Sequence, residues 1–251
     1  MRKIYGVHPV EEALRAGKVE AVFIADDEDK RLLTITRACS ERRVPLDTKS
    51  RAELTLLCES DKHQGAVALS GDYEYTSLDA ILDGVGVGGS GSGSDRAPLV
   101  LVLDSIQDPG NLGALLRSAH IFGVDGVVLP KDRAARVNST VVKASAGATE
   151  HLAIAIETNL QRALEQCKAA GLWIAGAVAE GGRDPFATEL NLPLALVLGA
   201  EGKGIRPLLQ KSCDLKLRIP MVGQVASLNV SVAGGILLYE VIRQRAQGAA
   251  T

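Results

Sequence analysis

The chain has 251 residues, of which 46% are hydrophobic, and its formal net charge at pH 7 is −2. These values exclude a disordered chain and give no overall charge that would by itself indicate a nucleic-acid partner. Scattered cysteines and histidines without metal-ligand spacing, and the lack of a long apolar run, favour a cytoplasmic protein with reduced thiols, no metal site and no membrane span.

The first 83 residues are expected to form a small α/β module. A helix is predicted to begin near Pro9, and a second one to cover residues 27–43. Strands are predicted over 20–25 and 64–70. Nothing in this part of the sequence indicates catalysis.

A glycine- and serine-rich stretch from Gly84 to Ser94 separates this module from the rest of the chain. It holds six glycines and three serines in eleven residues. As a flexible coil, a segment of this length has a root-mean-square reach of roughly 18 Å. We therefore expect a first domain at 1–83, a flexible linker at 84–96 and a second domain at 97–251.

Strands and helices alternate in the second domain. Strands are predicted at 98–104, 126–130, 152–157, 172–178, 194–199 and 215–220, with helices between them and a last helix from Ser227 to Arg245. This alternation is typical of a parallel sheet covered by helices on both faces. Ligands of such sheets bind at the carboxyl ends of the strands, so the site is expected in the loops 105–111, 177–182, 199–204 and 220–227.

The stretch LVLGAEGKGI, Leu196 to Ile205, looks at first like a phosphate-binding loop. A Walker loop requires Ser or Thr after Gly-Lys, however, and here Gly204 follows Lys203. The dinucleotide fingerprint would require a third glycine where Pro207 stands. A doubly wound nucleotide-dependent oxidoreductase is therefore excluded.

Two other strand-end segments carry polar residues with more than one interpretation. Asn111 precedes a helix and is explained equally well as an N-cap or as a functional residue. Arg117 is either a boundary residue with a buried stem or a guanidinium aimed at the strand-end cleft. The last helix is apolar on nearly every side but begins with Ser-Leu-Asn-Val-Ser, in which Ser227 is a possible N-cap.

Three motifs in chain order resemble those of the SpoU-type RNA ribose 2′-O-methyltransferases. They are N-x-G-x-x-x-R at 111–117, L-G-A-E-G-x-G at 198–204, and I-P-M-x-G-x-x-x-S-L-N-V-S-V-A at 219–233. The resemblance covers residues 97–245. The opening IYGVHPVEEAL and the HQGAVAL stretch resemble the small ribosomal-protein-like RNA-binding domain of the branch that methylates a guanosine of 23S rRNA.

The resemblance implies an α/β protein with a small N-terminal ribosomal-protein-like domain and a C-terminal parallel-sheet domain that contains a trefoil knot. It also implies S-adenosylmethionine as cofactor, RNA as substrate and a homodimer. By matching motif positions, the residues that line the cofactor would be Gly199, Ile219, Met221 and Leu228.

The same resemblance assigns the catalytic residues Arg117, Asn111, Glu201, Ser227 and Asn229. The family interpretation makes Arg117 the proton acceptor. Because a guanidinium is essentially always protonated, stabilising the developing oxyanion and anchoring a phosphate is the role that we expect for it. The other four would orient Arg117, the ribose or the helix start, and Glu201 would either hold Arg117 or accept a ribose hydroxyl.

The interpretation as a 23S rRNA guanosine 2′-O-methyltransferase has three alternatives. One is methylation of tRNA, another is methylation of a different rRNA position as in antibiotic resistance, and the third is a non-catalytic RNA-binding ribosome-assembly factor. Charge alone does not decide, since residues 117–143 carry a net charge of only +3, from Arg117, Lys131, Arg133, Arg136 and Lys143 against Asp125 and Asp132. Such a strip is explained either as a solvated face or as a surface that contacts phosphates.

Overall fold

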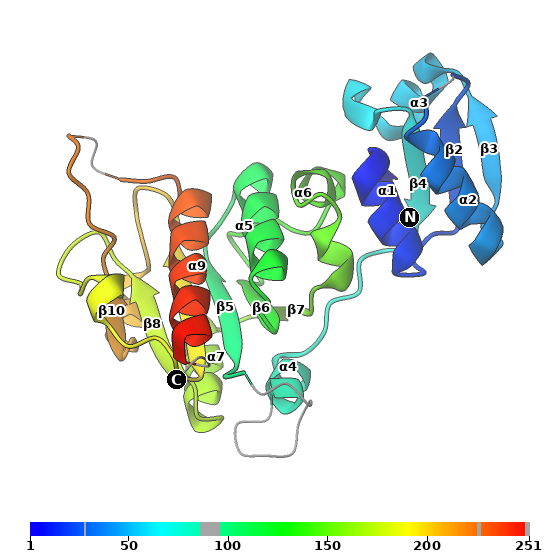
Figure 1. The fold of residues 1–251 in the computed structure, drawn as a ribbon. Coiled ribbons are helices and arrows are strands. Elements are labelled where there is room, and N and C mark those ends of the chain that lie inside the picture. The colour runs from blue at the N-terminus through cyan, green and yellow to red at the C-terminus, as the bar shows by residue number, and fades with distance from the viewer. Residues whose placement is uncertain (28, 86–95, 225–226, 249–251) are drawn as a thin grey trace. The chain divides into compact units, whose positions relative to one another are not determined.

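The computed structural model describes residues 1–27, 29–85, 96–224 and 227–248. These residues contain two sheets, of four and six strands (Figure 1). Contacts divide the chain into two compact units. Residues 1–74, 112–117 and 136–151 form the first, and the remaining described residues form the second.

The first unit is built on the four-stranded sheet, in which the strand order is β1-β4-β2-β3. Strand β4 is antiparallel to both of its neighbours, whereas β2 and β3 are parallel. The strands are β1 (Arg2–Tyr5), β2 (Ala21–Ala25), β3 (Leu46–Lys49) and β4 (Ala66–Ser70). The predicted strands at 20–25 and 64–70 are confirmed as β2 and β4, while the two short strands β1 and β3 were not predicted.

The helical elements of the first unit are α1 (Val7–Arg15), α2 (Leu32–Arg42), α3 (Arg51–Cys58), α6 (Ser139–Ala144) and the short 3-10 turns η1 (Asp61–His63) and η2 (Ala148–His151). Helix α3 begins with a capping box, because Ser50 and Glu53 satisfy each other's backbone amides. His63 is 3% exposed, and burial lowers the pKa of its imidazole. His63 is therefore a neutral structural residue.

The second unit is built on a six-stranded sheet with the order β10-β8-β9-β5-β6-β7, all parallel. The strands are β5 (Leu99–Asp104), β6 (Gly126–Pro130), β7 (Ile154–Glu157), β8 (Trp173–Ala177), β9 (Leu194–Gly199) and β10 (Leu215–Leu217). Every residue of the two central strands, β5 and β9, is buried. The predicted parallel-sheet α/β domain is therefore confirmed.

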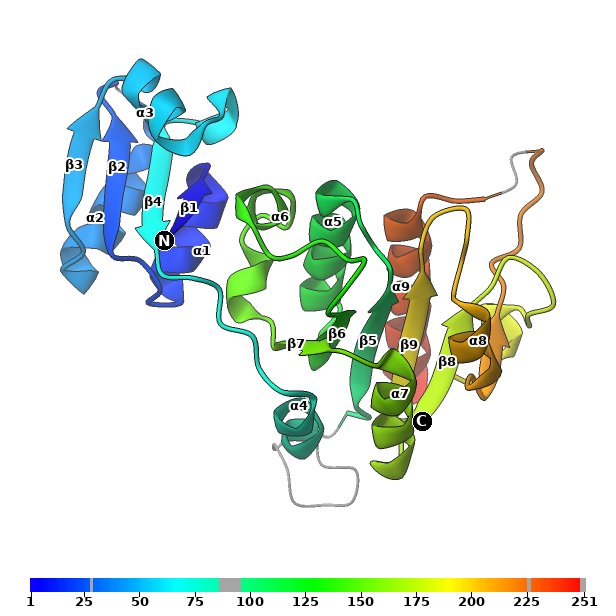
Figure 2. The ribbon, with the colours of Figure 1, turned by 180° about the vertical axis from the view of Figure 1, so that it is seen from behind.

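Helices cover both faces of this sheet. They are α4 (Leu78–Val85), α5 (Pro109–Ile121), α7 (Leu160–Ala169), α8 (Pro207–Lys211) and α9 (Val230–Gly248), with a 3-10 turn η3 (Pro185–Ala187). Helix α9 crosses one face, and α7 and α8 lie on the opposite face, as the two views show (Figures 1 and 2). The core on the α7 side is a cluster of aliphatic residues from β5, β8, β9 and these helices.

The segment that precedes the glycine-rich stretch belongs to the second unit. The Thr76 amide donates to the carbonyl of Ile154, at 2.9 Å, and so extends the β7 edge of the sheet. Leu78 and Ile81 of α4 are 1% and 4% exposed within the core cluster. The predicted boundary after residue 83 therefore falls inside α4, and residues 86–95 of the predicted linker lie outside the described residues.

The four cysteine thiols are largely buried. Cys39, Cys58 and Cys167 are buried, Cys213 is half-buried, and none of the four forms a disulfide. Burial raises the pKa of both Cys167 and Cys213 to about 11, so these two thiols stay protonated near neutral pH. In the part of the chain that the structure describes, no helix is long and apolar enough to cross a membrane.

We predict that Ile81→Ala lowers the free energy of unfolding by about 2–4 kcal/mol, because it leaves a cavity beside β6 that the helix cannot close. The Ile81 side chain packs directly on Gly126, where an ideal Cβ would lie 2.4 Å from Cγ2 of Ile81. Urea denaturation measures the change. Asp83→Ala, an exposed substitution on the same helix, is the control and is expected to stay within about 0.5 kcal/mol of the wild type. Equal losses for the two variants would contradict a core role for α4.

Candidate functional site

The loop after β9 turns back over the end of its own strand. An ideal Cβ on Gly199 would lie 2.0 Å from the carbonyl carbon of Gly204 and 2.1 Å from the amide nitrogen of Ile205. The Gly204 amide donates to the carbonyl of Ala200 at 2.7 Å and closes the turn. Gly202 and Gly204 have φ of 75° and 65°, in the left-handed region that favours glycine. The glycines of LGAEGKGI thus serve a tight return of the backbone.

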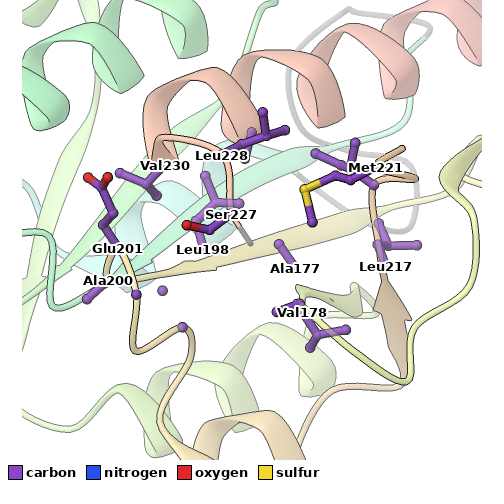
Figure 3. Close-up of a pocket in the computed structure, with 16 residues that line it drawn as sticks. Ala177, Val178, Leu198, Ala200, Glu201, Leu217, Met221, Ser227, Leu228 and Val230 are labelled. Atoms are coloured by element: carbon purple, nitrogen blue, oxygen red, sulfur yellow. The ribbon is translucent and has the colours of Figure 1, made fainter. Parts of the chain in front are cut away.

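A pocket with a cavity volume of about 140 Å³ opens at the carboxyl ends of β8, β9 and β10 (Figure 3). It is lined by three chain segments: residues 177–179 after β8, 198–204 after β9, and residues from Leu217 to Ala233 around the start of α9. All four residues predicted to line a cofactor are in this lining, namely Gly199, Ile219, Met221 and Leu228.

The lining also holds residues that were not among the predicted site residues. Ala177, Val178 and Ala179 follow β8, and Val230 and Ala233 come from the first turn of α9. All five side chains are small and apolar and carry no chemical group that would mark them as site residues. The available signal for residues 177–179 was the expectation that the loop 177–182 lies at a strand end, and for Val230 and Ala233 it was their place in the third motif.

Polar side chains from three segments meet at the rim of the pocket. Asn229 Nδ2 donates to Asn111 Oδ1 at 2.9 Å and, at 3.4 Å, to Glu201 Oε2. Glu201 and Ser227 are themselves part of the pocket lining. The structure therefore brings four of the five predicted catalytic residues, Asn111, Glu201, Ser227 and Asn229, to one place.

The N-cap residues of helices α5 and α9 differ from the residues that the sequence had suggested. Helix α5 is capped by Asp108, whose carboxylate accepts the amide of Asn111 at 2.7 Å, so an N-cap role for Asn111 is wrong. The side chain of Asn111 is thereby left for Asn229. At α9, the Asn229 carbonyl oxygen accepts from the amide and the hydroxyl of Ser231, at 2.9 and 2.6 Å. Asn229, rather than Ser227, caps this helix, which begins at Val230.

The fifth predicted residue, Arg117, stays outside this network. It lies on α5, is exposed, and makes no hydrogen bond or ion pair with any other residue in the described ranges. A guanidinium in this state keeps all five of its N–H donors available for an external oxyanion.

Such a site suits an uncharged or cationic ligand better than a phosphate. The lining is mostly apolar, and the Glu201 carboxylate at its rim would repel an anion and attract a cation. The amides of Asn111 and Asn229 supply neutral donors and acceptors beside it. Among the residues described, no three His, Cys, Asp or Glu side chains are arranged to hold a metal ion.

Comparison with known proteins gives consistent matches. Residues 98–239 match the family model described as SpoU rRNA Methylase family, and residues 3–76 match the model for RNA 2′-O ribose methyltransferase substrate binding. The chain is 40% identical to a 23S rRNA (guanosine-2′-O-)-methyltransferase of Pseudomonas aeruginosa, over 97% of this chain and 96% of that protein. It is 37% identical to a Staphylococcus haemolyticus protein of the TrmH family of tRNA/rRNA methyltransferases, over 97% and 96%.

A solved structure is similar over nearly the whole length. The crystal structure of the SpoU methyltransferase AviRb from Streptomyces viridochromogenes, in complex with the cofactor AdoMet, superposes with a TM-score of 0.78. The two chains are 25% identical, and the match covers 98% of this chain and 91% of the other.

We predict that Gly199→Ala destabilises the chain by at least about 1–3 kcal/mol, because a methyl group at this position overlaps the returning backbone. The same change should abolish measurable binding of S-adenosylmethionine in calorimetry. Gly84→Ala on α4 is the matched control, since an ideal Cβ there meets nothing within 4 Å and the residue lies outside the pocket lining. A Gly199→Ala variant with the stability and affinity of the Gly84→Ala variant would contradict the role of the close return.

Proposed function

Because the chain belongs to the SpoU rRNA methylase family, we propose that it transfers the methyl group of S-adenosylmethionine to the ribose 2′-hydroxyl of a guanosine in 23S rRNA. The observation that carries the proposal is the pocket at the ends of β8, β9 and β10, with the Asn111–Asn229–Glu201 network at its rim. The match to 23S rRNA (guanosine-2′-O-)-methyltransferases over nearly the full chain supports the choice of substrate.

In this proposal, S-adenosylmethionine occupies the pocket and supplies a methyl group on a sulfonium sulfur. Gly199, Ile219, Met221 and Leu228 contact it, largely through the main chain, because the lining offers few polar side chains. The Glu201 carboxylate is tolerated beside a sulfonium, since opposite charges attract. The AdoMet complex of the similar AviRb structure supports the choice of cofactor.

The polar residues hold the ribose. Asn111, Glu201, Ser227 and Asn229 orient the attacking hydroxyl toward the methyl group, and positioning alone supplies a large part of the rate of such an in-line displacement. Arg117 anchors the adjacent phosphate and stabilises the negative charge that develops on the oxygen. The exposed and unpaired state of its guanidinium among the described residues supports this role.

The proposal includes a homodimer formed through α9. Val232, Ile236 and Tyr239 are 50%, 38% and 56% exposed, and their spacing places them on one face of that helix. Ile121, 65% exposed, ends α5 beside this face, where the rings of Phe122 and Tyr239 lie 6.2 Å apart. A continuous exposed apolar face of this kind favours association with a second copy.

Three further features of the proposal rest on the family. They are a trefoil knot in the C-terminal part, RNA binding by the first 74 residues, and a cytoplasmic location where rRNA is available. The first rests on the family alone, and the match of residues 3–76 to a substrate-binding model supports the second.

Methylation of tRNA is the second candidate function, because the Staphylococcus haemolyticus relative belongs to a family of tRNA/rRNA methyltransferases. Methylation of another rRNA position would use the same site. A non-catalytic assembly factor would have no use for the polar network at the rim, and that network supports the enzyme.

The test is methyl transfer from labelled S-adenosylmethionine to protein-free 23S rRNA, 16S rRNA and bulk tRNA, read by nucleoside mass spectrometry. We expect 2′-O-methylguanosine in 23S rRNA alone. Arg117→Ala should lower kcat at least about 1000-fold, as the loss of a group that stabilises an oxyanion does, and leave cofactor affinity within twofold. Arg162→Ala, which removes an exposed arginine from α7, is the control and should retain full activity.

Each outcome of this assay has a defined meaning. Label in tRNA would replace the substrate and keep the chemistry. Normal turnover of the Arg117→Ala variant would refute its catalytic role. Cofactor binding without transfer to any RNA would favour the assembly factor.

The dimer has its own test by light scattering at micromolar concentration. We predict a dimeric mass for the wild type and a monomeric mass for Tyr239→Glu, because a carboxylate on the apolar face of α9 would lose its hydration in the interface. Leu208→Glu changes an equally exposed apolar residue on α8 and should remain dimeric. A monomeric wild type would refute the proposal.

A further inference from the structure

A buried carboxylate, that of Asp104, lies next to the loop that lines the pocket. Asp104 is the last residue of β5, is 0% exposed, and pairs in register with Gly199 of β9. Burial of an isolated carboxylate is strongly unfavourable, so such a group is retained only where donors satisfy it.

The donors come almost entirely from one residue on the far side of the loop. The amide of Arg206 donates to Asp104 Oδ2 at 2.9 Å, and its Nε donates to Oδ1 at 2.8 Å. The hydroxyl of Ser105 adds a third bond to Oδ1, at 3.0 Å. Asp104 therefore holds both the main chain and the side chain of Arg206, which lies 102 residues further along the sequence.

Arg206 stands at the point where the loop ends. It follows Ile205, which is 6% exposed in the core, and precedes α8 at its first residue, Pro207. The other end of the loop is fixed by the pairing of β9 with β5. Asp104 thus joins the strand that begins the loop to the residue that closes it, and the pocket-lining residues 199–204 lie between these two points.

We propose that Asp104 is a positioning residue, which fixes the loop 199–205 in its cofactor-binding conformation by holding Arg206. This inference rests on the proposed function for the identity of the ligand, but the hydrogen bonds between Asp104 and Arg206 are a feature of the fold. An asparagine cannot replace Asp104, because its amide nitrogen would face one of the two N–H donors of Arg206.

The chain offers a matched control in Asp125. This carboxylate accepts the amide of Leu99 at 2.7 Å and pairs with the guanidinium of Arg96, at the opposite end of β5. It therefore repeats the combination of one main-chain and one arginine donor, at a place remote from the pocket lining. Its side chain is 20% exposed, against 0% for Asp104, so its loss should cost less stability. A purely structural effect should nevertheless lower the stability of both variants, whereas an effect on the pocket loop should appear only at Asp104.

The experiment measures S-adenosylmethionine affinity by calorimetry, well below the melting temperature, and hydrogen exchange of the amides in 199–206 by mass spectrometry. We expect Asp104→Asn to weaken binding at least about tenfold, since a hydrogen bond to a charged group is lost, and to speed exchange in this loop. In methyl transfer, the KM for the cofactor should rise while the KM for RNA stays within twofold. Asp125→Asn should lower the melting temperature and leave affinity, loop exchange and both KM values within twofold.

Arg206→Ala gives a second variant in case Asp104→Asn does not fold, because it alters a side chain that is 47% exposed. It removes the Nε donor but keeps the amide donor, so we expect a smaller loss of affinity, about fivefold. The double variant should bind no more weakly than Asp104→Asn alone, since both changes remove the same bond.

Affinity and loop exchange within twofold of the wild type in Asp104→Asn, or in Arg206→Ala should the former not fold, would overturn the inference. Equal loss of affinity in Asp125→Asn would also overturn it. If the wild type bound no S-adenosylmethionine, the proposed function would fail, and the hydrogen-exchange comparison would still decide whether Asp104 holds the loop.

Discussion

Gly199 stands where the returning chain crosses the end of β9, and no side chain fits between the two backbones. The consequence is a tightly turned loop in which residues 199–202 and Gly204 line the pocket. Because the strands are parallel, the loops after β8 and β10 emerge on the same edge and complete the lining. The site is therefore a product of sheet geometry together with one position that only glycine can occupy.

Asn229 links this loop to the rest of the site. Its oxygen caps α9, and its nitrogen bridges Asn111 and Glu201, so one side chain connects a helix start, a second helix start and the loop. A neutral amide suits this place, because it can donate and accept at once without a buried charge. A change at Asn229 would therefore alter the fold and the site together. Arg117 has no structural partner among the described residues, so its replacement tests the proposed chemistry without removing a contact of the fold.

Elements that follow from the periodicity of apolar residues and from the alternation of strands and helices could be predicted from the sequence. Features that depend on contacts with residues far away in the sequence could not. The parallel sheet and the pocket edge follow from apolar runs separated by helices. The apolar spacing of residues 78–85 is compatible with a helix such as α4, but the glycine-rich stretch that follows led us to place the domain boundary after residue 83, inside this helix. The N-cap of α5 could also have been predicted from the sequence, because Asp108 precedes a proline at the first helical position. The role of Asp104 could not have been predicted, since it depends on Arg206, which lies beside it only in the folded chain.

The geometry at the rim bears on how the ribose hydroxyl loses its proton. Arg117 is permanently protonated and cannot accept it. Among the described residues, Glu201 accepts one long hydrogen bond, at 3.4 Å from Asn229 Nδ2. Its carboxylate therefore retains acceptor capacity beside the pocket. In the proposed function, this spare capacity lets Glu201 accept a hydrogen bond from the ribose hydroxyl and orient it, while Arg117 stabilises the negative charge that develops on the oxygen.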